Sequence, residues 1–180
     1  MLPARQHLSF RKALTRVRMF LMKSAMLQAT SRFLFVTSLA RNRIRSIDPD
    51  GVHLFLLPDT TNAEIGTSVR RCLSMSREVS AQEMSKIIGS SQAREADWAR
   101  LTAQRFGYSS PSALYKDIAS CDIKEFENSI RIEPSNHSTL REWSDDGLSE
   151  RDWVVLKRNA SDERLGSGCR IALCRCISHV

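Results

Sequence analysis

The sequence has no apolar run that approaches the roughly 18 residues needed for a membrane-spanning helix. Its N-terminus also lacks the continuous apolar core and the small-residue cleavage site of a secretory signal. The five cysteines are an odd number without the regular spacing of a disulfide framework, which favours reduced thiols. From these absences we expect a cytoplasmic protein whose fold does not rely on disulfides.

Signatures of catalysis and nucleotide binding are missing as well. The sequence has neither a Walker loop nor a Gly-x-Gly-x-x-Gly motif. Cys121 and His137 could in principle serve as nucleophile and base, but no nucleophile-elbow glycines and no third orienting group accompany them. A cysteine at the start of a strand is more often part of the core, so we assign no catalytic residues.

Acidic residues are absent from the first 47 residues, which hold ten Lys or Arg residues. The other 133 residues hold 17 basic and all 20 acidic residues, a balance of −3. The formal net charge of +7 therefore describes an N-terminal segment and not the body of the protein. We interpret residues 1–30 as a basic extension, disordered or helical, and residues 31–180 as a single domain. The alternative is a basic amphipathic arm that binds nucleic acid or an anionic surface.

What the sequence does contain is a segment that occurs twice. Residues 54–77 and 154–177 align without a gap at an offset of 100 residues. Each copy has an apolar run, a polar turn and a helical pattern, and Thr61 to Glu64 form a capping box at the start of the first helix. Gly66 and Gly166 lie inside these helices, where Gly costs about 1 kcal/mol relative to Ala. We interpret their recurrence as a close approach of each helix to the sheet.

Between the two copies the pattern is first helical and then strand-like. Ser80 and Ser110-Pro111 predict helix starts, and Gly107 predicts a helix end. Residues 121–126 and 129–133 then read as a β-hairpin. The fold class predicted is α+β, with two pseudo-symmetric halves, each made of mostly antiparallel strands followed by a helix. The halves share a core, and a helical insert separates them.

A group of cysteines near the C-terminus consists of residue types that zinc binds. Its members are Cys169, Cys174, Cys176 and His179. The first copy of the repeat has Val69, Ser74 and Ser76 at the three cysteine positions, so the fold does not require sulfur there. We therefore expect packed or exposed thiols and neither a metal nor a cofactor.

Acidic side chains gather in the twenty residues before the second copy, with tryptophans among them. The candidate interface residues are Glu133, Glu142, Trp143, Asp145, Asp146, Glu150 and Asp152. One interpretation is a solvated face with core tryptophans. The other is a surface that meets a basic partner, because tight interfaces use aromatic anchors within charged surroundings.

Several ordered segments resemble one family. Residues 105–121 read RFGYSSPSALYKDIASC, residues 130–143 read IRIEPSNHSTLREW, and residues 154–176 read VVLKRNASDERLGSGCRIALCRC. In this order and spacing they resemble the immunity proteins of contact-dependent growth inhibition, over about residues 43–177. Lys157-Arg158 departs from the family pattern, in which Ile-Pro ends the strand.

The resemblance implies a cytosolic protein without enzymatic activity. Its partner would be the C-terminal toxin domain of an exported effector, commonly a nuclease, whose active site the immunity protein blocks. The resemblance also implies a fold similar to the whirly type of single-strand-binding protein. The acidic body of the chain suits a nuclease with a basic, phosphate-binding surface. The alternative function is a nucleic-acid-binding module that uses the basic residues 1–47 and a whirly-like sheet.

Overall fold

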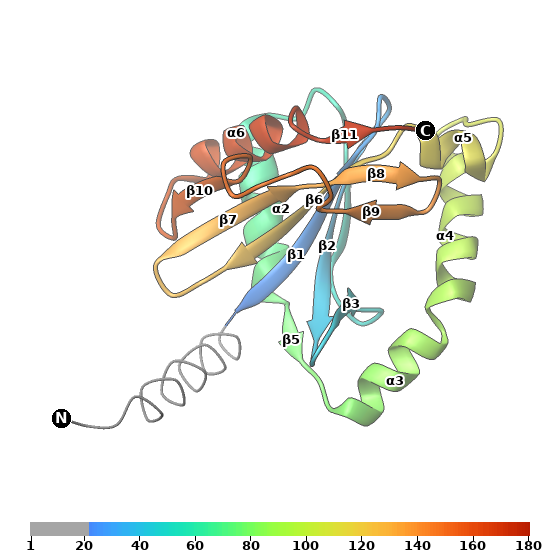
Figure 1. Ribbon diagram of the computed structural model, residues 1–180, viewed down its shortest axis with the longest axis horizontal. Helices are drawn as coiled ribbons and strands as arrows, with labels where there is room; N and C mark the ends of the chain where they lie inside the picture. The colour runs from blue at the N-terminus through green and yellow to red at the C-terminus, as the bar shows by residue number, and fades with distance from the viewer. Residues whose placement is uncertain (1–21) are drawn as a thin grey trace.

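A mainly antiparallel sheet forms the centre of the molecule (Figure 1). The structure, a computed structural model, describes residues 22–180. Within that range eight strands make up this sheet: β10, β7, β6, β1 and β2 are neighbours in that order, and β3, β4 and β5 each pair with β2. The strands are β1 Lys23–Ala29, β2 Leu34–Arg41, β3 Arg45–Ile47, β4 His53–Leu56, β5 Arg77–Glu78, β6 Ala119–Glu125, β7 Ser129–Pro134 and β10 Val154–Lys157.

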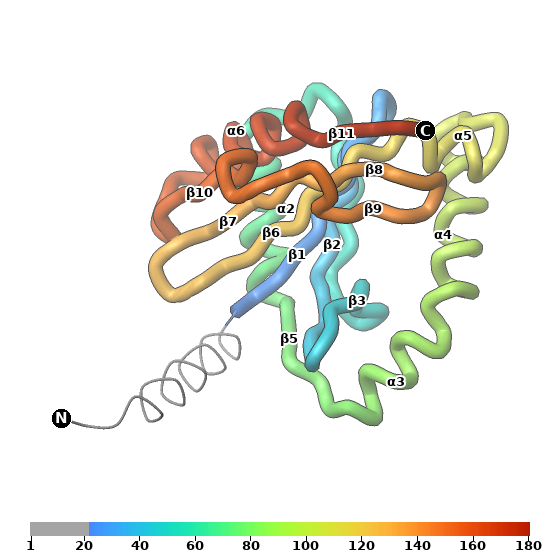
Figure 2. The backbone as a smooth tube through the Cα atoms, viewed as in Figure 1, coloured from blue at the N-terminus to red at the C-terminus, as the bar shows by residue number. Residues whose placement is uncertain are grey.

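A smaller sheet and the helices complete the fold. The smaller sheet has the order β11-β8-β9, with strands β8 Asn136–Thr139, β9 Glu142–Ser144 and β11 Ile177–Ser178. The helices are α2 Asn62–Ser74, α3 Ala81–Gly89, α4 Ser91–Arg105, α5 Pro111–Lys116 and α6 Asp162–Leu173. Figure 2 shows α3, α4 and α5 following one another along one side of the molecule.

The described chain consists of two matched halves, as the repeat predicts. In the first half β1, β2, β4, α2 and β5 follow in order, and in the second half β6, β7, β10, α6 and β11 do so. The antiparallel strands β1 and β6 meet at the centre of the sheet, where Leu27 lies opposite Cys121. Helices α3 to α5 lie between the halves in sequence. The predicted α+β fold, with mostly antiparallel strands and a helical insert, is therefore confirmed.

The main core lies between the sheet and the helix pair α2–α6. Alternate strand residues point to this side, among them Leu27, Val36 and Ile123, which are fully buried. The helices contribute Ile65 and Leu165, which occupy matching positions in the repeat and are also fully buried. A second apolar cluster on the other side packs α4 and α5 against β2 and includes Phe33, Phe35, Ala99, Leu114 and Tyr115. The sheet is thus covered on both sides at its β2 end.

Gly66 and Gly166 mark the place where α2 and α6 touch. A Cβ atom on Gly66 would lie 2.0 Å from the carbonyl oxygen of Asp162, and one on Gly166 would lie 1.9 Å from that of Asn62. Each glycine therefore packs on the first residue of the opposite helix. The predicted close approach of these helices to the sheet is wrong, because the crowded contact is between the two helices.

Two arginines at matching positions reinforce this helix pair. Arg70 donates through Nε to Asp162 Oδ1 at 2.7 Å, and its guanidinium also reaches the carbonyl oxygen of Ala160. Arg170 donates through Nε to Asn62 Oδ1 at 3.0 Å and reaches the carbonyl oxygen of Thr60. Each arginine thus binds the N-terminal turn of the other helix and satisfies carbonyl groups in the loop before it.

Strand β1 corrects the predicted boundary at residue 30. Residues 23–29 pair with both β2 and β6 and occupy the middle of the sheet. Ser24, Ala25, Leu27 and Gln28 are all buried, so the strand has no exposed side that would produce a polar alternation. The sequence of this strand therefore shows no strand-like pattern. The rest of the predicted extension, residues 1–21, lies outside the described residues.

The connections between elements differ from the prediction in smaller ways. The helix predicted to begin at Ser110-Pro111 ends at Lys116, and Ala119 begins β6. Strands β8, β9 and β11 were not predicted, since they have two to four residues and are partly exposed. The predicted caps at Thr61, Ser80 and Ser110 are confirmed, each accepting a hydrogen bond from the backbone amide three residues on.

A buried carboxylate joins the insert to the first half. The Asp48 side chain is fully buried and receives a bidentate pair from Arg77, with Nε 2.5 Å from Oδ2 and Nη2 2.9 Å from Oδ1. Arg77 also contacts Glu83 in α3 at 2.6 Å. Burial by itself raises the pKa of Asp48, but the hydrogen bonds from Arg77 and from the Asp50 amide together lower it below its usual value.

The contact between α2 and α6 predicts that alanine destabilises the protein at the two contact glycines but not at a glycine outside the contact. Gly66→Ala or Gly166→Ala should lower the free energy of unfolding by at least about 3 kcal/mol, because the added methyl group meets backbone that cannot move without separating the helices. Gly89→Ala is the matched control, since its Cβ would meet nothing within 4 Å. It should leave stability unchanged or raise it by up to about 1 kcal/mol. Urea denaturation of the three variants measures the difference, and equal midpoints would contradict the crossing.

The Asp48 carboxylate predicts a loss of stability in acid. Because its pKa in the folded protein lies below the unfolded value, its contribution is complete above that unfolded value and disappears as the pH falls through the folded one. The free energy of unfolding should therefore decline below about pH 4. Asp48→Asn should cost roughly 2–4 kcal/mol at neutral pH and make the acid decline shallower. Asp50→Asn, at an exposed partner of the same arginine, should change stability by less than about 1 kcal/mol.

Candidate functional site

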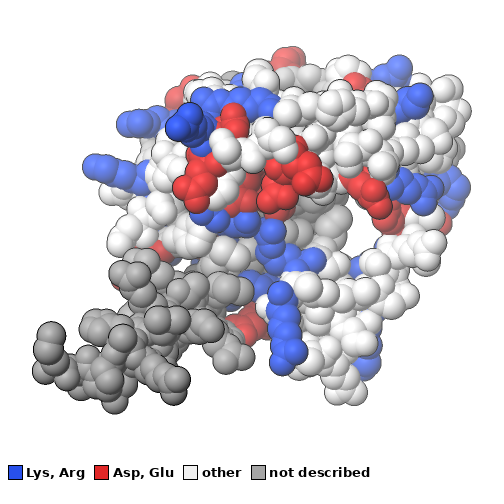
Figure 3. Space-filling model, viewed as in Figure 1, with Lys and Arg blue, Asp and Glu red and all other residues white. Residues whose placement is uncertain are grey.

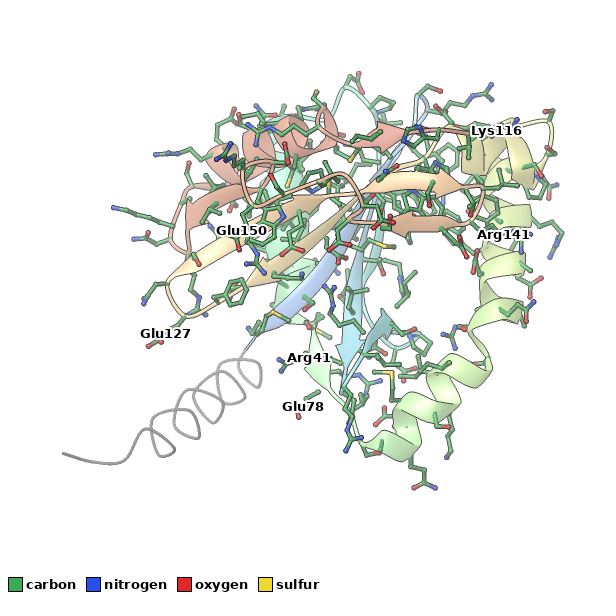
Figure 4. All side chains as sticks on the ribbon, viewed as in Figure 1. Arg41, Glu78, Lys116, Glu127, Arg141 and Glu150 are labelled. Carbon is green, nitrogen blue, oxygen red and sulfur yellow. The ribbon has the colours of Figure 1, made fainter. Side chains whose placement is uncertain are left out.

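The candidate acidic residues follow one another from the end of β7 to the start of β10. Glu133 lies in β7 and Glu142 in β9, and the other acidic candidates lie in the loop between β9 and β10. Figure 3 shows red carboxylates gathered in one area of the visible surface, over β6, β7 and the β8–β9 hairpin. In Figure 4 the labelled Glu150 lies in front of β7. The candidates thus lie in one continuous stretch of the chain between β7 and β10.

Four of the seven candidates are exposed and carry unpaired charge. These residues are Glu142, Asp145, Asp146 and Glu150. Within residues 22–180 none of the four takes part in an ion pair. Glu142 and Asp146 accept only hydroxyl hydrogen bonds, from Thr139 and Ser144, both at 3.1 Å. Their negative charges are therefore available to a partner. We call these four residues the acidic patch.

The loop that carries the acidic patch is held in shape by its own polar groups. Asp152 Oδ2 accepts from the amide of Ser149 at 2.8 Å and from its hydroxyl at 3.0 Å, and these bonds lower the pKa of Asp152. Asn136 Nδ2 donates to the Asp146 carbonyl at 2.8 Å. Gly147 adopts a φ of +77°, which turns the chain between these two attachments. Asp152 therefore orders the loop. Because it is half-buried, it exposes less negative charge than the residues of the acidic patch do.

Glu133 is neutralised by its neighbours on the sheet. It forms ion pairs with Lys124, and with Arg131 at 2.5 Å, and its side chain is only 15% exposed. Asp122 lies directly opposite on β6 and pairs with Arg45 at 2.7 Å. Charges of both signs therefore alternate across this face of the sheet. Glu133 belongs to that network and not to the acidic patch.

Trp143 is a packing residue of the hairpin. Its ring stacks on that of His137 with centroids 4.4 Å apart and planes 16° apart. Its Nε1 donates to the Ile118 carbonyl at 3.4 Å, and its ring lies 6.4 Å from that of Tyr115. The side chain thus attaches β9 to the end of the helical insert. Trp143 is half-buried, and it anchors the strand that carries Glu142 of the acidic patch.

An arginine held between two aromatic rings lies in β7, and we call this arrangement the aromatic clamp; it was not predicted from the sequence. The Arg131 guanidinium lies 4.1 Å from the centre of the Trp153 ring and 5.0 Å from that of Phe126. The clamp joins β7 to the residue before β10. The repeated occurrence of Trp and Arg in this stretch was visible in the sequence, but their pairing depends on the strand register.

The cysteines that were considered for metal binding or catalysis differ in their exposure to solvent. Cys121 and Cys169 are fully buried in the main core, whereas Cys174 is exposed at the end of α6. No hydrogen bond joins Cys121 to His137 in the described chain, and His137 Nε2 instead lies 3.3 Å from the Leu140 carbonyl oxygen. No cluster of three or more potential metal-binding side chains occurs among residues 22–180. Helices in that range are also all too short or too polar to cross a bilayer.

Comparisons with known proteins relate the whole described fold to one family. The family model described as CDI immunity protein (CdiI) matches residues 23–176. The chain is similar to immunity protein CdiI-YPIII of Yersinia pseudotuberculosis serotype O:3, with 30% identity over 166 residues, 84% of this chain and 94% of that protein.

Two solved structures are similar as well. One is in a CdiA-CT/CdiI toxin and immunity complex from Yersinia pseudotuberculosis, with a TM-score of 0.78 and 27% identity over 86% of this chain and 97% of that chain. The other is a protein of unknown function from Neisseria meningitidis, with a TM-score of 0.78 and 28% identity over 87% of this chain and 96% of that one.

The packing of Trp143 predicts a structural defect when the ring is removed. Trp143→Ala should lower the free energy of unfolding by roughly 2–4 kcal/mol, because the stack on His137 and the contact with the insert are lost. Leu101→Ala, at a side chain that is 53% exposed, is the control and should change stability by less than about 0.5 kcal/mol. Urea denaturation compares the two. Equal stability of both variants would mean that Trp143 is free to act as an interface anchor.

Proposed function

This chain belongs to the CDI immunity protein family, and we propose that it binds and neutralises the C-terminal toxin domain of a contact-dependent growth inhibition effector. The observation that carries the proposal is the family match across both halves of the repeat and the insert between them. One of the similar solved structures is a complex of a toxin with its immunity protein. In this proposal the chain acts by stoichiometric binding and not by turnover.

The toxin is proposed to be a nuclease whose active site the acidic patch covers. A nuclease must attract the phosphate backbone, so its active-site groove presents basic side chains. The carboxylates of Glu142, Asp145, Asp146 and Glu150 are exposed and have no ion-pair partner in the described chain, and the loop after β9 is ordered by hydrogen bonds of Asn136 and Asp152. Such a surface accelerates association with a basic groove and competes with nucleic acid for it.

The position of the acidic patch within the repeat supports an interface there. The chain between β7 and β10 holds the β8–β9 hairpin and the loop that follows it, residues 145–153. The matching chain between β2 and β4 holds the short strand β3. A scaffold that is common to both halves therefore carries an addition found in one half. Surfaces that distinguish one partner from another are built from such additions, while the shared core maintains the fold.

The charges of the sheet favour a protein partner over nucleic acid. Arg41 and Arg45, which belong to the basic N-terminal segment, pair with Glu78 and Asp122. On the face opposite α2 and α6, β6 and β7 present Asp122 and Glu133 among their basic neighbours. A single-strand-binding sheet would instead offer basic side chains and free aromatic rings along one path. The alternative function consequently receives less support from the structure than the binding of a toxin.

Charge reversal of the acidic patch tests this proposal. The triple variant Asp145→Lys, Asp146→Lys, Glu150→Lys should fold normally, because all three carboxylates are exposed and lack ion-pair partners in the described chain. It should associate with its cognate toxin domain roughly 10- to 100-fold more slowly at low salt, because the steering field is reversed. Surface plasmon resonance gives the rate, and growth of cells that express the toxin gives the protection.

A matched variant separates local from global charge. Asp59→Lys, Asp97→Lys, Glu127→Lys changes the net charge by the same amount at exposed positions outside the acidic patch. It should retain rapid association and protection. If both triple variants lose the same amount, net charge and not the acidic patch drives recognition. If neither loses affinity, the toxin binds elsewhere on the chain.

A further inference from the structure

Two cysteines from distant parts of the second half lie next to each other. The sulfur atoms of Cys121, in the middle of β6, and Cys176, between α6 and β11, are 3.6 Å apart. A disulfide bond has an S–S distance of about 2.05 Å, so its formation requires the two sulfur atoms to approach by roughly 1.5 Å. The contact is not part of a metal-binding cluster, since residues 22–180 contain no group of three or more potential metal ligands.

The two thiols differ in their access to solvent. Cys121 is fully buried, whereas Cys176 is partly exposed and lines a cavity of about 150 Å³ together with Lys116, His137 and Trp143. A molecule the size of hydrogen peroxide fits in this space, because a water molecule occupies about 30 Å³ of liquid. An oxidant therefore reaches Cys176 first and Cys121 only through it.

The local hydrogen bonds prepare Cys176 to react. The two sulfur atoms share a hydrogen bond in which either can be the donor. This bond lowers the pKa of Cys176, burial opposes the shift, and backbone hydrogen bonds at Ser135 and Ser120 add to it, so that the pKa falls to about 7. The same contact and burial raise the pKa of Cys121. Because the thiolate is the reactive form, Cys176 is the better nucleophile of the two at neutral pH.

We propose that Cys121 and Cys176 are a redox-active pair that hydrogen peroxide converts into an intramolecular disulfide. The Cys176 thiolate attacks one peroxide oxygen, the O–O bond breaks, and a sulfenic acid and hydroxide form. Cys121 loses its proton to that hydroxide, which becomes water, and the Cys121 thiolate attacks the Cys176 sulfur. The S–O bond breaks and releases the second oxygen as hydroxide. The proton that Cys176 lost when it ionised converts this hydroxide to water. In total two thiols lose two protons and two electrons, and one peroxide becomes two water molecules.

The disulfide would fix the sheet that supports the acidic patch. Cys176 immediately precedes β11, and Ile177 and Ser178 pair with Asn136 and His137 of β8. A covalent link from β6 to the residue before β11 therefore attaches the smaller sheet to the main one. Oxidation therefore changes how firmly the β8–β9 hairpin is attached to the main sheet. The redox pair is independent of which partner that hairpin binds.

The first half of the repeat supplies variants that preserve the fold. Ser76 occupies the position of Cys176, and its hydroxyl accepts from the amide of Ser24 at 2.9 Å and donates to the Leu39 carbonyl at 3.0 Å. Ala25, the third residue of β1, corresponds to Cys121, the third residue of β6. Cys176→Ser and Cys121→Ala thus reproduce side chains that the same scaffold already accommodates.

Mass spectrometry of the full chain tests the pair. The reduced protein is treated with a small excess of hydrogen peroxide, quenched, unfolded and alkylated, then digested without reductant. We expect three of the five cysteines to be alkylated, the mass to fall by two hydrogen atoms before alkylation, and one linked peptide pair to contain Cys121 and Cys176. A chain with all five thiols free, or a link through Cys174, would overturn the proposal.

The variants test the order of the two steps. Cys121→Ala should stop at the sulfenic acid, which dimedone traps on Cys176, and Cys176→Ser should form neither that adduct nor an intramolecular disulfide. Cys174→Ser, at the exposed neighbouring thiol, is the control and should oxidise as the unaltered chain does. Dimedone on Cys121 in the Cys176→Ser variant would reverse the assigned roles and refute the mechanism. Melting curves before treatment verify that each variant is folded.

Discussion

The contact between α2 and α6 is the constraint on which the rest of the structure depends. Gly66 and Gly166 let each helix start against the middle of the other, so that no side chain separates the two backbones. Arg70 and Arg170 then bind the opposite N-terminal turns, where carbonyl and carboxylate groups need donors. At this distance both helices cover one continuous sheet, and the two halves become a single core. Glycine's cost within a helix is offset here by packing that no larger residue permits.

The two halves share this frame but are not used alike. The first half ends in the buried Asp48–Arg77 pair, which joins it to the helical insert. The second half carries the β8–β9 hairpin, the acidic patch and the Cys121–Cys176 contact, where the first half has β3, Ala25 and Ser76. Structural needs are met by positions that recur in both copies. The hairpin, the acidic patch and the Cys121–Cys176 contact have no counterpart in the first half, and they are the features that distinguish the chemistry of the second half.

The candidate site shows how environment sorts residues of the same type. Seven residues were selected because acidic and aromatic side chains cluster in the sequence. The structure leaves Glu142, Asp145, Asp146 and Glu150 with unpaired charge, while Glu133 is neutralised by Lys124 on β6 and by Arg131 on its own strand. Asp152 shapes the loop and Trp143 anchors the hairpin. Composition identified the region, but it could not assign these roles, because partners on neighbouring strands are set by register.

The sequence by itself determined the duplication, the caps at Thr61, Ser80 and Ser110, and the α+β class, because these depend on local spacing and on side chains that bind their own backbone. It failed at β1, whose residues are buried on both sides and so show no alternation. Only the tertiary structure decided that each glycine packs on the first residue of the opposite helix, that Cys121 approaches Cys176, and which carboxylates remain free. The glycine and cysteine contacts join residues about 50 to 100 positions apart, and no local pattern encodes them.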